Sequence, residues 1–250
     1  AAGCLIAASG AEAADEADYV VTMLPAGRHV RQVYEGELFD AVSPTVLLLD
    51  CSTIDVATAK AVAEAARVKG LAMVDAPVSG GIAAANGGTL TFMVGGANEH
   101  FARAEPNLAA MGKAVIHAGL SGAGQAAKIC NNMILGATMV ATCEAFLLAQ
   151  KLGLDPQTFY DIASKASGQS WSMTSYCPLP GVGPESPADK GSQGGFAKAL
   201  KLAMGAAQDA NASVPMGGAA EALYQMFANQ GSGGLDFSAI IGMLGGEKPA

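Results

Sequence analysis

The pattern of apolar residues changes near residue 119, and this change limits the folds that the chain can adopt. Before it, short apolar runs alternate with stretches of helical periodicity. After it, residues 122–151 contain no proline and, beyond Gly122 and Gly124, only Gly136 as a further glycine. A segment of this length without breakers predicts a single long helix. We therefore predict an α/β domain followed by an all-α domain, joined through that helix.

In the first part, apolar runs bounded by turn residues predict strands at 19–24, 46–51, 71–75, 89–94 and 114–117. Helices are predicted at 55–69 and 98–111, with Thr53 or Asp55 capping the first of them and Gly70 ending it. Strands that alternate with helices indicate a largely parallel α/β sheet.

In the second part, further helices are predicted at 155–166, 196–212, 215–230 and 236–244. Residues 167–195 are rich in Gly, Pro and Ser and predict a long ordered loop. The predicted domains are 1–119 and 120–250, with a hinge near 119–122. The chain opens on AAGCLIAASG, which is typical of the middle of a fold, so we expect the α/β domain to be incomplete at its N-terminus.

Charge and composition exclude several classes of partner. The net charge is −8, and only 14% of residues are charged, against about 25% in an average soluble domain. An acidic chain of this kind disfavours nucleic acid and anionic membranes as partners, although local cations can still bind a small anion. The most apolar stretch, 133–143, stops at Glu144, short of the roughly 20 residues of a membrane span.

Cysteine and histidine usage predicts neither a disulfide framework nor a metal site. The five cysteines are scattered without a C-x-x-C pair, and the three histidines are equally dispersed. An odd, unpatterned set of cysteines is typical of a reducing compartment. We expect a cytoplasmic protein, or one of the mitochondrial matrix in a eukaryote. The apolar helices of the second part would suit a homodimer or homotetramer.

Two glycine clusters have the composition of ligand-binding turns. GAGQAA at 122–127 matches the dinucleotide fingerprint, and Glu144 lies about 20 residues on, where the ribose-binding acid is expected. That fingerprint also requires a second strand after its helix, whereas here the predicted helix continues through Glu144. We therefore interpret this cluster as a tight turn that begins a helix.

The other cluster, DAPVSGGIAAANGG at 75–88, follows a predicted strand end, where α/β sheets place their ligand sites. Ser79, Gly80 and Gly81 offer a hydroxyl and unhindered backbone N–H groups that suit a carboxylate. The alternative is a flexible connection whose glycines only satisfy turn geometry. Spacing alone does not decide between the two.

Lys128 is the one charged side chain between Lys113 and Glu144. Asn131 and Asn132, three and four residues on, share its face of the predicted helix. Burial would lower the pKa of such a lysine toward the range useful for proton transfer. The alternative is a partly exposed helix lysine whose polar neighbours mark the solvent side.

Several strings resemble the β-hydroxyacid dehydrogenase family. DAPVSGG (75–81) and GTLTFMVGG (88–96) resemble its substrate-binding signature, and GAGQAAKICNN (122–132) resembles its catalytic helix. Within the family, the branch acting on 3-hydroxyisobutyrate is the most similar, through TMLPAGRHV, DCSTID, SGQSWS, PLPGV and QGGF. The resemblance covers essentially the whole chain and implies a Rossmann domain, a long interdomain helix and a helical domain.

The resemblance also implies a reaction and roles for individual residues. It implies NAD-dependent oxidation of 3-hydroxyisobutyrate to methylmalonate semialdehyde, as in valine catabolism, with NADP not excluded. Lys128 would be the catalytic lysine and Asn132 would position it and the substrate. The other implied contacts are with the substrate, through Ser79, Gly80, Gly81 and Trp171, and with the nicotinamide half of the cofactor, through Leu24, Pro25, His29 and Thr53.

Two departures from the family pattern leave alternatives open. The family's opening strand and GxGxxG turn are not in this sequence, and the choice between NAD and NADP is made in that region. In GGFAKALKLAMGAA, Lys198 aligns with a family cofactor lysine, but Ala199 replaces the adjacent aspartate and Lys201 is a competing placement. A tartronate semialdehyde reductase or related short dehydrogenase is one rival function. A non-catalytic ligand-binding or scaffold protein is another.

Overall fold

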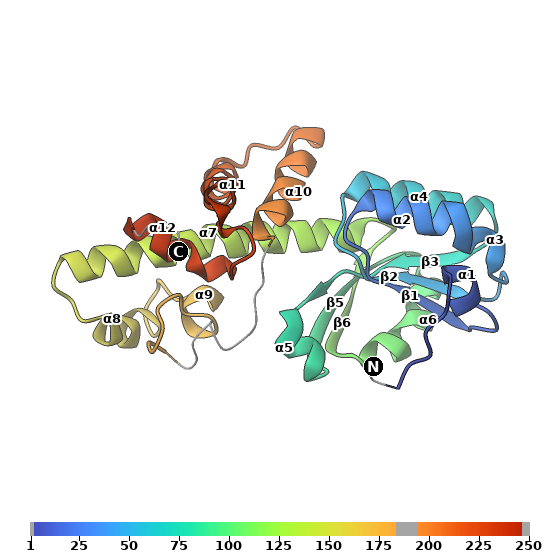
Figure 1. Ribbon diagram of the computed structural model, residues 1–250, viewed down its shortest axis with the longest axis horizontal. Coiled ribbons are helices and arrows are strands. Elements are labelled where there is room, and N and C mark those ends of the chain that lie inside the picture. Colours follow the sequence, from blue (N-terminus) through green and yellow to red (C-terminus); the bar gives the residue numbers. More distant parts are fainter. Residues whose placement is uncertain (1–2, 184–194, 247–250) are drawn as a thin grey trace. The chain divides into compact units, whose positions relative to one another are not determined.

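The computed structural model describes residues 3–183 and 195–246. By compactness the chain divides into two units, Ala1–Lys128 and Ile129–Ala250, which meet inside the long helix α7 (Ala123–Lys151). The domain boundary predicted at residues 119 and 120 precedes that helix. Figure 1 shows the sheet and its covering helices in the first unit and helices alone in the second.

The first unit contains a six-stranded mixed sheet. Its strands are β1 (Tyr19–Thr22), β2 (Leu47–Asp50), β3 (Ala72–Asp75), β4 (Val78–Ser79), β5 (Leu90–Gly95) and β6 (Gly112–Gly119). The strand order is β1-β2-β3-β5-β4, and β6 pairs with β5. β1, β2 and β3 are parallel, with Tyr19 opposite Leu47 and Leu47 opposite Ala72. The predicted Rossmann-type fold is therefore confirmed.

β6 is parallel to β5, so the prediction of a largely parallel sheet holds for three of the five strand pairs and was wrong for the two that join β5 to β3 and to β4. β5 runs antiparallel to β3, which it meets only at the pair Asp75–Gly95, and β4 is also antiparallel to β5. The cause is the connection between β3 and β5. It contains only β4 and the short helix α5 (Gly81–Asn86), and therefore makes a hairpin instead of the helical crossover that parallel strands require.

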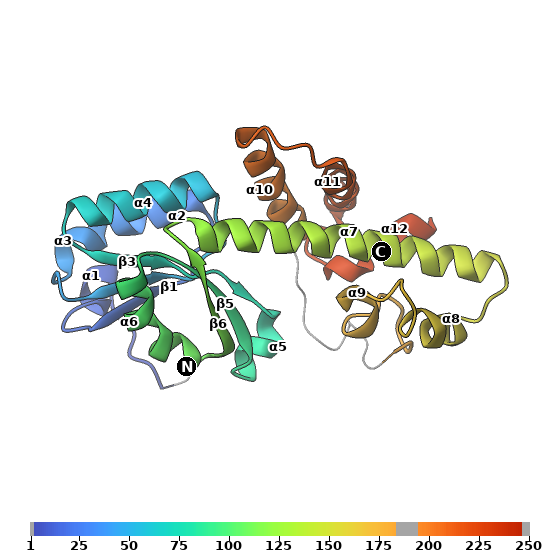
Figure 2. The same ribbon diagram turned by 180° about the vertical axis from the view of Figure 1, so that it is seen from behind.

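Two apolar clusters cover the two faces of this sheet. All four residues of β2 are buried, and they alternate between the faces: Leu48 packs with Val30 and Val62, whereas Leu47 and Leu49 pack with Leu108. Figures 1 and 2 show α2 (Gly27–Val33) and α4 (Val56–Val68) on one face and α6 (Asn98–Ala109) on the other. Burial on both faces explains why the parallel strands are continuous apolar runs in the sequence.

The predicted helices of the first unit are present, and local chemistry explains their ends. Asp55 caps α4 by accepting a hydrogen bond from the backbone N–H of Thr58 at 2.7 Å, and Gly70, with φ +73°, follows its end. The segment after β1 was not predicted as helix. It forms α2, a π-helical turn η1 (Tyr34–Leu38) and α3 (Phe39–Ala41), and a short α1 (Gly10–Ala13) precedes β1.

The second unit is helical, as predicted. Besides its part of α7 it contains α8 (Pro156–Ala163), α9 (Trp171–Thr174), α10 (Phe196–Asp209), α11 (Pro215–Phe227), the turns η3 (Ala228–Ser232) and η4 (Phe237–Ala239), and α12 (Ile240–Gly245). The predicted loop at 167–195 contains α9, and its residues 184–194, including the start of the QGGF string, lie outside the described residues.

Stacked aromatic rings link α9 to the core of the second unit. Trp171 stacks on Tyr176, Tyr176 on Phe237 and Phe237 on Phe196, with ring centroids 4.9–5.2 Å apart. The Tyr176 hydroxyl donates a hydrogen bond to Asp236 at 2.6 Å. Aromatic pairs in this geometry contribute beyond the area that they bury, so α9 is well anchored despite its four residues.

By length and hydropathy, α7 passes the test for a membrane span, contrary to our expectation from the stretch at 133–143. Its most apolar window has a mean hydropathy of 1.5, and 44% of that window is buried in the protein. Long core helices of soluble proteins pass the same test. Within the second unit, Met139, Cys143 and Phe146 of α7 contribute to two apolar clusters, whereas Ile134 and Leu148 are exposed.

Candidate active site

The first group of predicted site residues lies where β1 and β2 end. Leu24 and Pro25 follow β1, and Thr53 follows β2, which runs parallel to β1. The backbone N–H of Leu24 donates to the hydroxyl of Ser52 at 2.8 Å, so the two loops are joined directly. The structure therefore brings together Leu24 and the segment around Thr53, at the edge of the sheet where α/β proteins place ligands.

A buried hydrogen-bond network supports these two loops. Thr22, at the end of β1, donates to a carboxylate oxygen of Asp50 at 2.9 Å, and the N–H of Ser52 donates to the same oxygen at 3.1 Å. Because the single hydroxyl proton of Thr22 goes to Asp50, the Tyr34 hydroxyl donates to Thr22, at 2.8 Å. Burial raises the pKa of Asp50, and the bonds from Ser52 and Thr22 oppose that rise.

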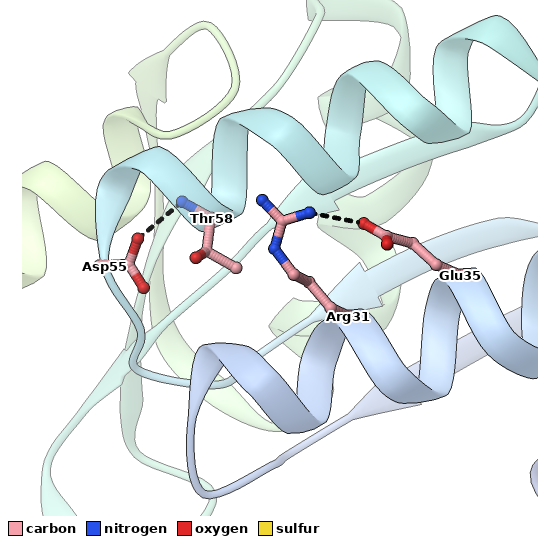
Figure 3. Close-up of polar contacts among 4 residues, drawn as sticks. All are labelled: Arg31, Glu35, Asp55 and Thr58. Atoms are coloured by element: carbon pink, nitrogen blue, oxygen red, sulfur yellow. Dashed lines mark hydrogen bonds and ion pairs between the residues drawn. The ribbon is translucent and has the colours of Figure 1, made fainter.

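His29 lies in the first turn of α2, beside these loops. Its Nδ1 atom is buried and has no hydrogen-bond partner among the described residues. The N-termini of α2 and α4 are packed closely, since a Cβ on Gly27 would lie 2.9 Å from the Asp55 carboxylate. Figure 3 shows the flank of this pair, with the Arg31–Glu35 ion pair along α2 and η1 and the Asp55 cap of α4.

The start of α7 is fastened to β3 by a carboxylate. Asp75 accepts hydrogen bonds from the backbone N–H groups of Gly122 at 2.6 Å and of Gln125 at 2.9 Å. Burial raises the pKa of Asp75, and these two bonds oppose the rise. A side chain of the protein therefore occupies the helix N-terminus at which a dinucleotide fingerprint would bind phosphate.

This arrangement confirms our interpretation of the GAGQAA string. α7 continues without a break through Glu144, so no second strand follows the turn. Gly124 is required for close packing, because a Cβ there would lie 2.8 Å from the carbonyl oxygen of Asp75 and would overlap that of Met93. Gly124 thus serves the contact between α7 and the sheet, whereas Gly122 has a φ of +88° and a Cβ there would lie 2.7 Å from the Lys60 side chain of α4.

Lys128 follows one turn after Gln125 on α7. Its side chain is partly buried, and burial lowers the pKa of its ammonium group from 10.5 to about 8. No ion pair of Lys128 occurs in the part of the chain that the structure describes. Asn132, one helical turn further on, is buried. A desolvated lysine with a pKa near 8 is suited to exchange a proton near neutral pH.

Ser79, Gly80 and Gly81 lie at the junction of β4 and α5. Gly80 and Gly81 have φ values of +133° and +68°, which favour glycine, and a Cβ on Gly80 would overlap Ala84. Turn geometry therefore accounts for both glycines. Ser79 and Gly81 are partly exposed and Gly80 is exposed, so the junction is also open to a ligand. The two interpretations of this cluster are compatible.

The remaining predicted residues belong to the second unit. Trp171 begins α9 and is 49% exposed, with one ring face against Tyr176. Lys198 and Lys201 lie in the first two turns of α10. Both side chains are exposed, so burial does not distinguish which of the two is the cofactor lysine.

Sequence reasoning missed the side chains that hold this site together. Asp50, Ser52, Asp75 and Gln125 are all buried and take part in most of its side-chain hydrogen bonds. The available signal was position: Asp50 and Asp75 are charged residues at the ends of strands that are otherwise wholly apolar. Among the described residues, no group of three or more His, Cys, Asp or Glu side chains could hold a metal ion.

Family models match almost the entire chain in two parts. Residues 1–119 match the NAD binding domain of 6-phosphogluconate dehydrogenase. Residues 122–244 match the NAD-binding domain of NADP-dependent 3-hydroxyisobutyrate dehydrogenase. The division between the two models falls at the turn before α7.

Characterised relatives and a solved structure agree with these models. A 3-hydroxyisobutyrate dehydrogenase of Pseudomonas aeruginosa is 47% identical, over 96% of this chain and 85% of its own length. An NAD-dependent L-serine dehydrogenase of the same organism is 44% identical, over 96% of this chain and 83% of its own length. The structure of Mycobacterium tuberculosis 3-hydroxyisobutyrate dehydrogenase with L-serine superimposes with a TM-score of 0.89 at 44% identity, covering 95% of this chain and 82% of that one. The chain belongs to the 3-hydroxyisobutyrate dehydrogenase family of NAD(P)-dependent β-hydroxyacid dehydrogenases.

Proposed function

We propose that the protein oxidises 3-hydroxyisobutyrate to methylmalonate semialdehyde, with Lys128 as general acid/base. The observation that carries this proposal is the state of Lys128: the one charged side chain between Lys113 and Glu144 is desolvated, and its pKa is about 8. A lysine that only marked the solvent side of α7 would keep the pKa of a hydrated ammonium group.

The reaction removes a hydride from the carbinol carbon and a proton from its hydroxyl. A nicotinamide cofactor bound at this site would supply the hydride acceptor. The neutral amine of Lys128 accepts the hydroxyl proton at Nζ as the carbonyl forms. In the reverse direction, the ammonium form donates that proton to the carbonyl oxygen and polarises the carbonyl beforehand.

The ends of β1 and β2 fit the nicotinamide half of the cofactor. Leu24, Pro25, His29 and Thr53 would hold it, and the buried Nδ1 of His29, which lacks a partner among the described residues, is a polar atom suited to bind a ligand there. In the second unit, Lys198, or Lys201 in its place, would contribute a positive charge toward the cofactor.

Substrate recognition would use a serine hydroxyl and backbone donors. We assign the substrate carboxylate to the Ser79 hydroxyl and the N–H groups of Gly80 and Gly81, which are open to a ligand at the β4–α5 junction. Asn132 would orient the substrate and the lysine one turn before it on α7. Trp171, half-exposed beside Tyr176, would close the substrate pocket with its free ring face.

The proposal is tested by the enzyme's choice of substrate. Oxidation of 3-hydroxyisobutyrate, L-serine and glycerate would be compared by kcat/KM, with NAD and with NADP. We expect 3-hydroxyisobutyrate to be preferred by about 10-fold or more, the scale on which one pocket discriminates such analogues. Preference for L-serine would instead indicate an L-serine dehydrogenase, like the second Pseudomonas relative. Absence of saturable NADH binding would favour the scaffold alternative.

The pH dependence should follow the ionisation of Lys128. Its pKa of about 8 lies below the ordinary 10.5, so the neutral base is populated above about pH 8. We expect kcat/KM for oxidation to rise with pH through that value and then level off, and kcat/KM for reduction to fall over the same interval. Initial rates in both directions from about pH 6 to about pH 10 would test this. A flat oxidation profile would contradict the role of Lys128.

A further inference from the structure

The side chain of Gln125 makes two hydrogen bonds to one short backbone segment. Its Nε2 donates to the carbonyl oxygen of Ser52 at 2.7 Å, and its Oε1 accepts from the N–H of Ile54 at 3.0 Å. The side chain is fully buried. The amide therefore holds the backbone on both sides of Thr53, in the manner of a neighbouring strand, and we call this pair of bonds the Gln125 clamp.

The Gln125 clamp joins the cofactor loops to the start of α7. On one side, the Ser52 hydroxyl accepts from the N–H of Leu24, so the loop after β1 is attached to the same segment. On the other side, the backbone N–H of Gln125 donates to Asp75, which fixes the first turn of α7 on β3. Lys128 lies three residues further along that helix.

The buried polar side chains of the first unit lie together where the Gln125 clamp joins the cofactor loops to α7. Among the described residues of that unit, the buried polar side chains are Thr22, Asp50, Ser52, Asp75 and Gln125. Hydrogen bonds connect them from Thr22 to Asp50, Ser52, Gln125 and Asp75. Each buried polar group would cost free energy if unpaired, and a fully bonded network specifies a single geometry.

We propose that Gln125 is a positioning residue, which sets the spacing between Thr53, at the nicotinamide end of the cofactor, and Lys128. This inference rests on the proposed function, because it takes the roles of Thr53 and Lys128 from it. Hydride and proton transfer both need the reacting groups at closely defined distances, and a shift of about 1 Å lowers rates by about 100-fold. The clamp would supply that definition through two bonds to a single side chain.

The test is Gln125→Met, which keeps the length of the side chain and removes both bonds. We expect kcat to fall by about 10- to 100-fold. We also expect the primary isotope effect on kcat, with substrate deuterated at the carbinol carbon, to increase, because hydride transfer becomes more fully rate-limiting. Hydrogen exchange without cofactor should show faster exchange of the Ile54 and Leu24 amides, while the β2 amides keep their protection.

Thr142→Val is the matched control. Thr142 is also buried on α7, and its hydroxyl donates to the carbonyl oxygen of Thr138 at 2.7 Å. The substitution removes one buried hydrogen bond from the same helix and should leave the isotope effect and the Ile54 exchange as in the wild type. If both variants alter these quantities equally, Gln125 is only a stabilising residue and the proposal is overturned.

A second variant covers the case in which Gln125→Met does not fold. Gln125→Glu keeps an oxygen acceptor for the Ile54 N–H and replaces the amide donor to Ser52 with a carboxyl oxygen, which also adds a buried charge when ionised. This variant should retain Ile54 protection and still increase the isotope effect. An unchanged isotope effect in this variant would also overturn the proposal. Failure of the proposed function would be distinguishable from failure of this inference. Full turnover in Lys128→Ala would contradict the assignment of Lys128 as general base, whereas hydrogen exchange at Ile54 would still show whether Gln125 holds that segment.

Discussion

Lys128→Ala is expected to lower kcat by about 1,000-fold, within the range of 100- to 10,000-fold that a positioned general acid/base contributes. The methyl group cannot accept the hydroxyl proton, and it cannot polarise the carbonyl in the reverse direction. The dissociation constant for NADH should stay within about twofold, because Lys128 is not among the residues assigned to the cofactor, which are Leu24, Pro25, His29, Thr53 and Lys198. Steady-state rates and fluorescence titration would measure the two quantities separately.

Lys151→Ala controls for the loss of a lysine from the same helix. Lys151 is exposed at the end of α7, and its removal should leave kcat unchanged. Small primary amines added to Lys128→Ala should restore part of the rate, since they supply the missing base. Turnover near the wild-type level in Lys128→Ala, without added amine, would end the assignment.

The lowered pKa of Lys128 also implies that the stability of the folded protein depends on pH. Between about pH 8 and pH 10.5 the unfolded chain holds the Lys128 proton and the folded chain does not, so stability contributed by this group rises with pH there. Below pH 8 the folded protein carries the whole cost of a desolvated charge. Lys128→Met should therefore raise Tm at neutral pH, by about 2–4 °C for each kcal/mol recovered. A residue retained at a cost in stability is typical of functional sites.

The elements of the fold were largely predictable because the buried strands are continuous apolar runs in the sequence. β2 and β3 are buried on every residue, and their apolar runs, each closed by an aspartate, identified them. The direction of β5 was not predictable in the same way. It depends on whether the segment at 76–89 crosses over or turns back, and the two-residue strand β4 that turns it back is too short to show a period in sequence.

The site divides along similar lines. Lys128 and Ser79 stand in strings long enough to be identified as family motifs. The side-chain amide of Gln125 donates to the backbone carbonyl of Ser52, 73 residues away in sequence, a pairing that only the folded chain creates. The local sequence at Gly122 also matched the dinucleotide fingerprint. In the structure the backbone N–H of Gly122 instead donates to the Asp75 carboxylate and so attaches the start of α7 to the sheet. Side chains that hold other elements in place are therefore the part of the site that sequence reasoning recovers least.

Gly124→Ala should be among the most damaging substitutions of a small residue in this chain, although Gly124 lies in a helix where alanine is intrinsically favoured by about 1 kcal/mol. The new Cβ would overlap the carbonyl oxygen of Met93 and lie 2.8 Å from that of Asp75. Both obstacles are backbone atoms of the sheet and cannot rotate away. The first turn of α7 would have to move off β3, which weakens the bonds from Gly122 and Gln125 to the Asp75 carboxylate.

We expect a loss of about 3 kcal/mol, which corresponds to a fall in Tm of roughly 6–12 °C. Gly205→Ala is the matched control, since Gly205 is exposed inside α10 and a Cβ there meets nothing within 4 Å. That variant should be more stable than the wild type by about 0.5–1 kcal/mol, through helix propensity alone. Urea unfolding of both variants would measure the change in the free energy of unfolding, which should be a loss for Gly124→Ala and a gain for Gly205→Ala. A Gly124→Ala variant more stable than the wild type would show that α7 tolerates displacement from the sheet. Because Gln125 and Lys128 lie in the turn that follows Gly124, kcat of that variant would then measure how strongly catalysis depends on the position of the start of the helix.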